Sequence, residues 1–268
     1  MQKQKLLNAI SRYNIGPKSD NSPNATKWSV KEGNLTIHHL SQDKSCRIIT
    51  TVSGVELEDG AFGIYDPDKY AKILSALDSD IELEYHSKHG RQMAMYIKDN
   101  QITVDYILSP LDAIFNDQNK DPETERPLKA VPAPNVEFIL TREFCEKFIK
   151  SKNALPDAST FAVSAGKMGD TQDVEFIINH SNHPTNQIKM HIYTDITVNS
   201  DLDLVAFNAD YLKEIFLANK DFNTASITIF SKVISDPERG NRLAAGMDID
   251  FQGDDYTSKY RLSKVEIV

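Results

Sequence analysis

The sequence has little of what membrane-spanning, secreted or disulfide-stabilised proteins need. No apolar run approaches the roughly 20 residues of a membrane-spanning helix. We expect no signal peptide at Met1–Tyr13, because polar residues interrupt its apolar stretch and no small-residue cleavage site follows. The two cysteines, Cys46 and Cys145, are too few for a disulfide scaffold and suit a reducing compartment. We therefore expect a cytoplasmic protein without a membrane partner.

Motifs for enzymatic chemistry are also missing. The sequence contains neither a glycine-rich phosphate loop nor a nucleophile elbow. The pairs His86/His89 and His180/His183 lie in polar, turn-like stretches and lack the ligand spacing of a structural zinc site. Cys145 falls on the apolar face of a predicted helix, where an inert core thiol is expected. We therefore expect no catalytic residue, no metal and no cofactor.

The charge balance excludes one class of nucleic-acid-binding protein. The chain has 30 basic and 39 acidic residues, a net charge of −9 and a pI of about 5.3. Such a protein does not coat nucleic acid with its whole surface, although a local basic track remains compatible with this charge. With 268 residues and 40% hydrophobic content, the chain can form one large core or two ordinary ones.

Three segments share one pattern, in which a short β-rich run precedes a capping residue and an amphipathic helix. The predicted caps are Asp66, Thr141 and Asn208, whose side-chain oxygens can accept free helix N–H groups. Apolar residues follow each cap at i, i+3 or i+4 spacing, which indicates one buried helical face. A fourth helix is predicted near the start of the chain, with the apolar stripe Leu6, Leu7, Ile10 and Tyr13. The four starts recur at intervals of about 64, 75 and 67 residues.

Between the helices the sequence alternates between apolar and polar residues, which predicts half-buried antiparallel strands. His38 and His39 point to opposite sides of one such strand, so one of them is expected to be buried. The predicted strands are 25–31, 34–40, 46–53, 61–65, 81–86, 92–97, 101–107, 136–140, 159–165, 173–179, 188–193, 204–207, 225–231, 243–251 and 257–263. A parallel sheet needs a helix between most strands, and there are too few helices for that.

A polar and proline-rich segment at Asn116–Pro134 divides the chain into similar halves. It holds four of the eleven prolines, which stiffen and extend a linker. We therefore predict a first domain at 1–120, a linker at 121–134 and a second domain at 135–268. Each domain has two helices and many strands, so the predicted class is α+β.

The basic residues are unevenly distributed. The four helix segments carry a net charge of +5, which leaves −14 for the rest of the chain. Each helix taken alone is explained by an ordinary solvated face opposite its apolar stripe. Four helices with the same bias favour a second interpretation, a positive lining that faces a polyanion inside an acidic shell.

The order of these segments resembles a known family, the DNA polymerase sliding clamps or processivity factors. The tailed-phage type is the most similar, and the fold is related to that of proliferating cell nuclear antigen. The resemblance rests on the segments 33–53, 62–66 with 70–77, 136–155 with 162–167, and 207–267, whose ending at 260–265 is similar to the final strand of that antigen.

The resemblance implies two similar clamp domains in each chain, with antiparallel sheets outside and two short helices each facing a central hole. A homotrimer of two-domain chains gives a ring of six domains, closed by head-to-tail pairing of edge strands. Such a ring encircles duplex DNA and contacts phosphates without reading sequence. The DNA-facing candidates are Lys3, Lys5, Arg12, Lys69, Lys72, Arg142, Lys147, Lys150, Lys152, Lys213 and Lys220.

The resemblance also implies protein partners, namely a DNA polymerase and an ATP-dependent clamp loader in the cytoplasm of an infected bacterial host. In this family partner peptides dock beside the interdomain linker. The matching residues here are Leu128, Val131 and Pro132, with Val265 and Ile267 in the tail. An equally good interpretation of Val265 and Ile267 is that they complete the packing of their own sheet.

A different non-catalytic function stays open at this point. A β-rich virion or assembly protein that binds other proteins and not DNA shares the strands and the acidic charge. Such a protein has no reason to carry four basic helices at even spacing. Lysine-to-glutamate changes along the helices discriminate between the two functions, because only a clamp needs those charges for processive synthesis.

Overall fold

The computed structural model of the chain divides into two compact units. Unit 1 comprises Met1–Pro127 and Asp254–Ser258, and unit 2 comprises Leu128–Gly253 and Lys259–Val268. The structure describes residues 3–16, 25–41, 43–88, 91–114, 133–168, 171–181, 183, 185–193, 195–236 and 240–266. The predicted domain bounds omit one feature, because the segment Asp254–Ser258 from near the chain's end packs in unit 1.

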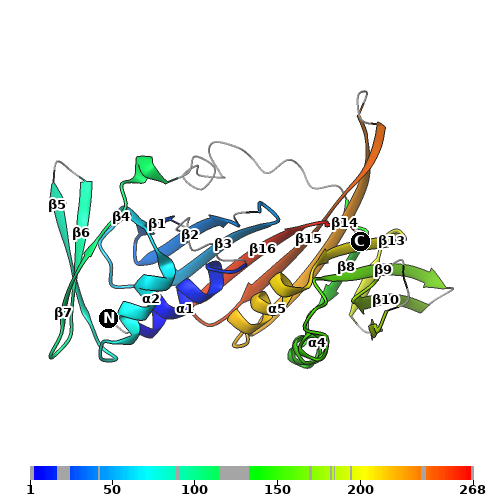
Figure 1. The fold of residues 1–268 in the computed structure, drawn as a ribbon, viewed down its shortest axis with the longest axis horizontal. Coiled ribbons are helices and arrows are strands. Elements are labelled where there is room, and N and C mark those ends of the chain that lie inside the picture. The colour runs from blue at the N-terminus through cyan, green and yellow to red at the C-terminus, as the bar shows by residue number, and fades with distance from the viewer. Residues whose placement is uncertain are drawn as a thin grey trace. The chain divides into compact units, whose positions relative to one another are not determined.

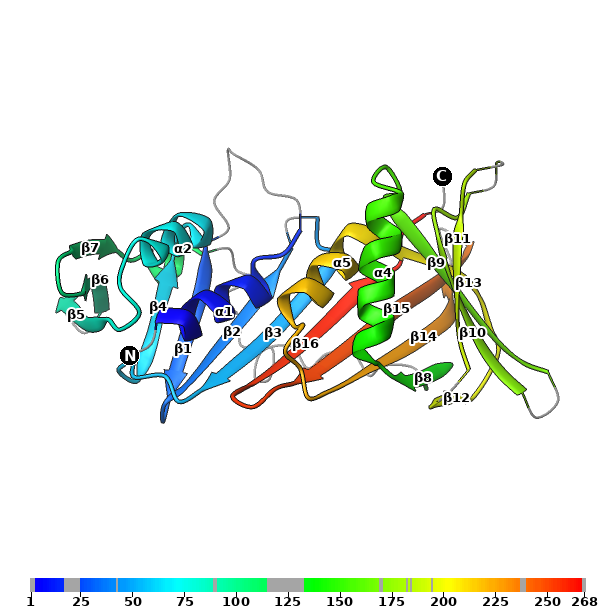
Figure 2. The ribbon, with the colours of Figure 1, turned by 90° about the horizontal axis from the view of Figure 1, so that it is seen from below.

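Unit 1 combines two helices with two antiparallel sheets in its described residues. Helices α1 (Lys3–Tyr13) and α2 (Pro67–Ser75) pack together, and α1 covers one face of β2 and β3 (Figures 1 and 2). The larger sheet has the order β3-β2-β1-β4, from β1 (Thr26–Lys31), β2 (Asn34–Leu40), β3 (Cys46–Ser53) and β4 (Gly60–Ile64). The smaller has the order β5-β6-β7, from β5 (Glu82–Lys88), β6 (Arg91–Lys98) and β7 (Thr103–Ile107); the 3-10 turn η1 (Leu111–Ala113) follows.

Unit 2 repeats this plan. Helices α4 (Arg142–Ala154) and α5 (Ala209–Ala218) lie side by side (Figure 2). One sheet has the order β12-β8-β14-β15-β16, from β12 (Ile196–Val198), β8 (Val136–Ile139), β14 (Thr224–Asp236), β15 (Gly240–Gln252) and β16 (Tyr256–Ser263). The other has the order β11-β10-β9-β13, from β11 (Ile188–Ile192), β10 (Thr171–Ile178), β9 (Thr160–Met168) and β13 (Leu202–Asn208). The predicted α+β class with antiparallel sheets and two helices in each half is confirmed.

The predicted helix caps are confirmed. The Asp66 carboxylate accepts the Lys69 N–H at 2.9 Å, the Thr141 hydroxyl accepts the Phe144 N–H at 3.1 Å, and the Asn208 amide oxygen accepts the Tyr211 N–H at 3.0 Å. Pro67 stands at the first position of α2, where its missing N–H costs nothing. Each helix therefore begins where its local sequence dictates.

The predicted strands are present, each within a few residues of its predicted bounds. Strand β12 was missed, because its three residues are too short for an alternating pattern to appear. It pairs with β8, which places Val198 opposite Val136. Strands β14 and β15 are longer than predicted, and their thirteen residues pair along their whole length.

Aromatic side chains fill both cores. In unit 1 the indole N–H of Trp28 donates to the Tyr13 hydroxyl at 3.3 Å, and the Trp28 ring centroid lies 5.8 Å from that of Tyr70. In unit 2 the ring of Phe148 lies 5.3 Å from Phe161 and 5.5 Å from Phe216, which joins α4, β9 and α5. Edge-to-face pairs such as these add to the burial of apolar area.

A buried histidine lies beside the unit 1 aromatic cluster. His39 is 2% exposed, its Nδ1 is 3.5 Å from the Thr26 hydroxyl, and its ring centroid is 5.7 Å from that of Tyr13. The expectation that one of the two neighbouring histidines is buried is thus confirmed. Burial disfavours the charged imidazolium and lowers the pKa of His39 to about 4.

We expect acid to destabilise unit 1 through His39. The unfolded chain binds a proton near pH 6.5 and the folded chain only near pH 4, so stability is complete above pH 6.5 and falls as the pH decreases toward 4. Between pH 7.5 and pH 5 this group removes about 2 kcal/mol of the free energy of unfolding. Urea denaturation followed by Trp28 fluorescence at both pH values measures the loss. His39→Gln should remove most of it, and an unchanged pH dependence in that variant contradicts the assignment.

Candidate nucleic-acid interface

The basic residues of α1 are committed to contacts within unit 1. The Lys3 ammonium donates to the carbonyls of Ser75, at 3.4 Å, and Leu77, where it complements the carbonyl end of α2. The Lys5 ammonium donates to the Ser53 and Gly54 carbonyls, each at 3.2 Å. It also lies 3.4 Å from the Asp255 carboxylate. Both lysines are half-buried, so they hold the fold together more than they extend into solvent.

Arg12 is buried, which the sequence did not suggest. Its side chain is 2% exposed, and its guanidinium lies 3.4 Å from the centroid of the Tyr256 ring. This cation–π contact joins α1 to the segment Asp254–Ser258 within unit 1. Because the guanidinium has no exposed surface, we leave Arg12 out of the DNA-facing set that we propose below.

Helix α2 presents the least compensated basic face. Lys69 and Lys72 are both exposed, one turn apart, while Tyr70 and Leu74 face the core. The acid in the first turn, Asp68, accepts a hydrogen bond from the Asn14 amide at 2.8 Å. These two lysines have the position and exposure that a phosphate contact requires.

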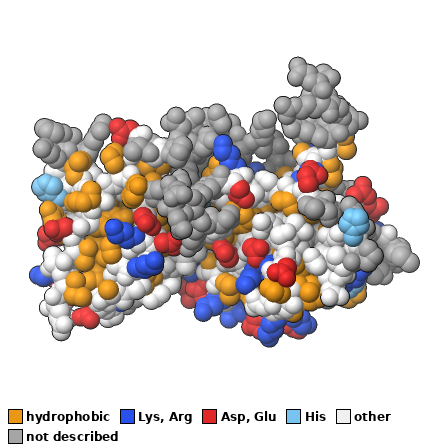
Figure 3. Space-filling view, viewed as in Figure 1, with side chains coloured by type: hydrophobic (Ala, Val, Ile, Leu, Met, Phe, Trp, Pro, Cys, Tyr) orange, Lys and Arg blue, Asp and Glu red, His pale blue; other side chains and the backbone are white. Residues whose placement is uncertain are grey.

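The exposed basic residues of α4 are balanced by acids on the same helix. Lys147 pairs with Glu143 at 2.6 Å, and Lys150 lies 3.9 Å from Glu146. The Lys147 ammonium holds the pKa of the Glu143 carboxyl below its ordinary value. Arg142 is exposed but tethered, because its guanidinium donates to the Phe222 carbonyl at 2.7 Å. Acidic and basic side chains are accordingly intermingled along the lower edge of Figure 3.

Lys152 is buried at the end of α4. It is 3% exposed, and its ammonium lies 2.8 Å from both the Pro156 carbonyl and the Asp210 carboxylate. The pair joins the last turn of α4 to the first turn of α5. Lys152 therefore has no surface to offer DNA, and we leave it out of the proposed set.

This pair gives a directional prediction for stability. Asp210→Ala leaves a buried ammonium with only a carbonyl partner, and we expect a loss of about 1–2 kcal/mol, since Asp210 itself is partly solvated. Lys152→Met replaces the ammonium with an apolar group of similar length, and we expect a loss below about 1 kcal/mol. Urea denaturation of both variants measures the order. The reverse order contradicts the view that the burial of the ammonium, and not the ion pair, dominates.

Helix α5 contributes two further candidates. Lys213 is half-exposed and Lys220, just beyond the helix, is fully exposed. The exposed candidates are thus Lys69, Lys72, Arg142, Lys147, Lys150 and Lys220, with Lys213 partly exposed.

The predicted peptide groove is only partly described. Leu128, Val131, Pro132 and Ile267 lie outside the described residues. The backbone N–H of Val265 donates to the Ala206 carbonyl at 2.9 Å, next to the edge of β13. This contact favours the interpretation in which Val265 completes its own sheet.

Sequence reasoning missed the buried residue Asn135, which follows the proline-rich segment. Its amide oxygen accepts the Ser231 N–H at 2.6 Å, and its amide nitrogen donates to the Ser200 hydroxyl at 2.8 Å. Its backbone N–H donates to the Ile229 carbonyl at 2.9 Å. Asn135 therefore fixes the start of β8 to β14 and to the turn before β13. A single Asn after a proline gives no sequence signal for this role.

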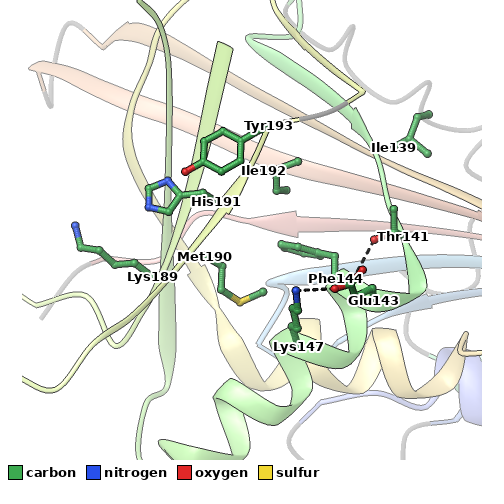
Figure 4. A pocket seen from close by; sticks show the side chains of 10 residues that line it. All are labelled: Ile139, Thr141, Glu143, Phe144, Lys147, Lys189, Met190, His191, Ile192 and Tyr193. Atoms are coloured by element: carbon green, nitrogen blue, oxygen red, sulfur yellow. Dashed lines mark hydrogen bonds and ion pairs between the residues drawn. The ribbon is translucent and has the colours of Figure 1, made fainter. Parts of the chain in front are cut away.

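Sequence reasoning also missed a pocket of about 430 Å³ between β11 and the start of α4 (Figure 4). Met190 and Ile192 project from β11 toward Phe144, and Ile139 lies at the far end of the pocket. His191 and Tyr193 lie on the other side of β11, where their rings stack at 5.7 Å. The apolar floor is incompletely covered, because Met190 and Ile192 are only half-buried.

The described residues contain no group of three or more His, Cys, Asp or Glu side chains placed to hold a metal ion. Both cysteines are free and buried, and burial raises the pKa of the Cys145 thiol to about 12, which is typical of an unreactive thiol. None of the described helices has the length and apolar character needed to cross a bilayer.

Comparison with known proteins shows a likeness in fold alone. No family model matches the sequence, and no curated protein does. Among solved structures, proliferating cell nuclear antigen from Entamoeba histolytica matches 99% of this chain and 96% of its own, with a TM-score of 0.66 and 13% sequence identity. The two-unit architecture described above is therefore that of a sliding clamp of the proliferating cell nuclear antigen type.

Proposed function

We propose that the protein is a sliding clamp in DNA replication. In this proposal three copies form a ring that encircles duplex DNA and tethers the replicative DNA polymerase, and an ATP-dependent loader opens the ring. The observation that carries the proposal is the likeness in fold over nearly the whole of both chains. The two helices in each unit, with exposed lysines on three of the four, support it.

The proposed mechanism is topological. A closed ring leaves DNA only by opening or by sliding off an end, so its contacts with the duplex can be few and weak. Phosphate contacts from lysines are independent of sequence and exchange readily, which permits sliding. The candidates that remain are Lys69, Lys72, Arg142, Lys147, Lys150, Lys213 and Lys220. Acidic residues elsewhere repel DNA and favour threading through the ring over adsorption outside it.

The finer assignments also belong to this proposal. A tailed-phage clamp acts in the cytoplasm of an infected bacterium and serves a phage polymerase. The competing function, a virion or assembly protein that binds other proteins, predicts no dependence on DNA ends and gives the α2 lysines no role.

The test combines native mass with a DNA-end experiment that needs no loader. A chain of 30.2 kDa should reach three times that mass in native mass spectrometry or light scattering at high concentration. The ring should bind linear duplex with open ends and lose most of that binding when streptavidin blocks both biotinylated ends. A surface binder is indifferent to the blocks. A strict monomer, or equal binding to open and blocked duplex, overturns the proposal.

A further inference from the structure

Two strands, one in each unit, present free edges of the same length. Among the described residues β7 pairs only with β6, and β11 pairs only with β10. Both strands have five residues. A free edge exposes a row of unpaired N–H and C=O groups that another strand can pair with. Each edge is therefore a place where a further strand can be added.

The two edges carry complementary charges. Asp105 is the single charged residue of β7, and Lys189 is the charged residue of β11, next to His191. Pairing β7 with a second β7 brings the Asp105 carboxylates together, and pairing β11 with a second β11 does the same for the Lys189 ammonium groups. Pairing β7 with β11 places opposite charges side by side.

Apolar side chains complement each other as well. Ile102, just before β7, is 41% exposed, and Ile107 at its end is 70% exposed. Hydrophobic side chains gather over β5–β7 in Figure 3. On β11 the half-buried Met190 and Ile192 form one wall of the pocket beside Phe144. The other outer strand of this sheet, β5, has no large hydrophobic residue among those exposed on the described surface.

We propose that the pocket beside β11 is completed by a second copy of this chain, whose β7 pairs antiparallel with β11. This inference rests on the proposed ring, because a contact between two different surfaces either closes into a ring or grows into a filament. In this arrangement Ile102 and Val104 of the second copy cover Ile192 and Met190, and the pocket against Phe144 is closed.

Side-chain alternation restricts the register of this pairing. Thr103, Asp105 and Ile107 are exposed on β7, and Lys189 and His191 are exposed on β11. Directly opposite residues point to the same face, so each odd-numbered residue must lie opposite another odd-numbered one. The register with Asp105 opposite Lys189 sets Thr103 opposite His191, Val104 opposite Met190 and Ile102 opposite Ile192. This register joins the opposite charges and covers both apolar pocket residues at once.

Disulfide trapping tests the register. In the variant with Thr103→Cys and His191→Cys, mild oxidation should link copies into covalent dimers and trimers on a denaturing gel. The control variants combine Thr103→Cys with Tyr193→Cys or with Lys189→Cys, which represent a slip of two residues in either direction. Directly opposite Cβ atoms come close enough for a disulfide and diagonal ones do not. The native cysteines are buried, so their background should be low.

A charge exchange provides a second measurement without oxidation. Asp105→Lys should weaken self-association of the chain at least tenfold in light scattering, because two ammonium groups then lie opposite each other. Adding Lys189→Glu should recover part of that loss. Lys189 already lies 3.1 Å from Glu175 in its own unit, so full recovery is not expected. No recovery, together with failure of the Thr103/His191 cross-link, overturns the inference.

The outcomes separate this inference from the proposed function. Cross-linking of one control pair in preference to Thr103/His191 overturns the register, even if the wild-type chain is trimeric. Failure of all three pairs in a trimeric protein overturns the β7–β11 interface and leaves the clamp standing. A wild-type chain that is monomeric at all concentrations overturns both.

Discussion

Replacing the three exposed lysines Lys69, Lys72 and Lys220 with glutamate is expected to abolish end-dependent binding to duplex DNA while the native mass stays unchanged. Each substitution removes a positive charge and adds a negative one. A ring of three copies therefore changes by eighteen charges around the duplex. At physiological salt we expect binding to open-ended duplex to fall at least tenfold. The dependence on salt should flatten too, since each lost phosphate contact reduces its logarithmic slope by about 0.9.

These three lysines are chosen because their loss should leave the fold intact. All three are exposed. Lys147 and Lys150 are avoided, since glutamate there lies one turn from Glu143 and Glu146 and repels them within the helix. The measurement is fluorescence anisotropy on open and end-blocked duplex across a salt series.

The matched control reverses three exposed lysines on strands, namely Lys31 on β1, Lys167 on β9 and Lys232 on β14. It changes the net charge by the same amount, so an effect of overall charge appears in both variants. The proposed lining predicts that only the helix variant loses binding. Equal losses in both, or full binding by the helix variant, contradict the assignment of these lysines to DNA.

The helices and their starts could be predicted from the sequence because their determinants are local. Asp66, Thr141 and Asn208 each bond a backbone N–H three residues later, within reach of a short pattern. The strands followed for the same reason, since alternation is visible in a window of five or more residues. Strand β12 is shorter than such a window.

The fate of the basic residues could not be predicted, because it depends on residues distant in the chain. Arg12 stacks on Tyr256, and Lys5 lies beside Asp255, both about 250 positions later. Lys152 meets Asp210 only once α4 and α5 have packed. A helical pattern shows that a lysine is opposite the apolar stripe, but not that a carboxylate or carbonyl from another element awaits it.

The pocket beside β11 is a tertiary feature of the same kind. Ile188, Met190 and Ile192 alternate as core residues do, and the sequence alone predicts that they are covered. The structure leaves them half-buried because the α4 helix meets β11 only near Phe144. The difference between predicted and observed burial is what indicates an incomplete surface.

Phe148→Ala is expected to destabilise unit 2 by about 3–5 kcal/mol, the usual range for deleting a fully buried phenyl ring. The ring has no exposed surface and packs edge-to-face on Phe161 and Phe216. Its removal leaves a cavity where α4, α5 and β9 meet, and the neighbouring rings are too constrained to fill it. Urea denaturation followed by far-ultraviolet circular dichroism measures the loss.

Two controls separate the cavity from a general effect of substitution. Leu217→Ala removes a similar side chain from α5, but Leu217 is 47% exposed, and we expect a change within about 0.5 kcal/mol. Trp28, the single tryptophan of the chain, is buried in unit 1, so its fluorescence reports on that unit. The tryptophan transition should shift less than the dichroism in Phe148→Ala. If both signals shift equally, the two units unfold as one, and the core of unit 2 then limits the stability of the α2 face that carries Lys69 and Lys72.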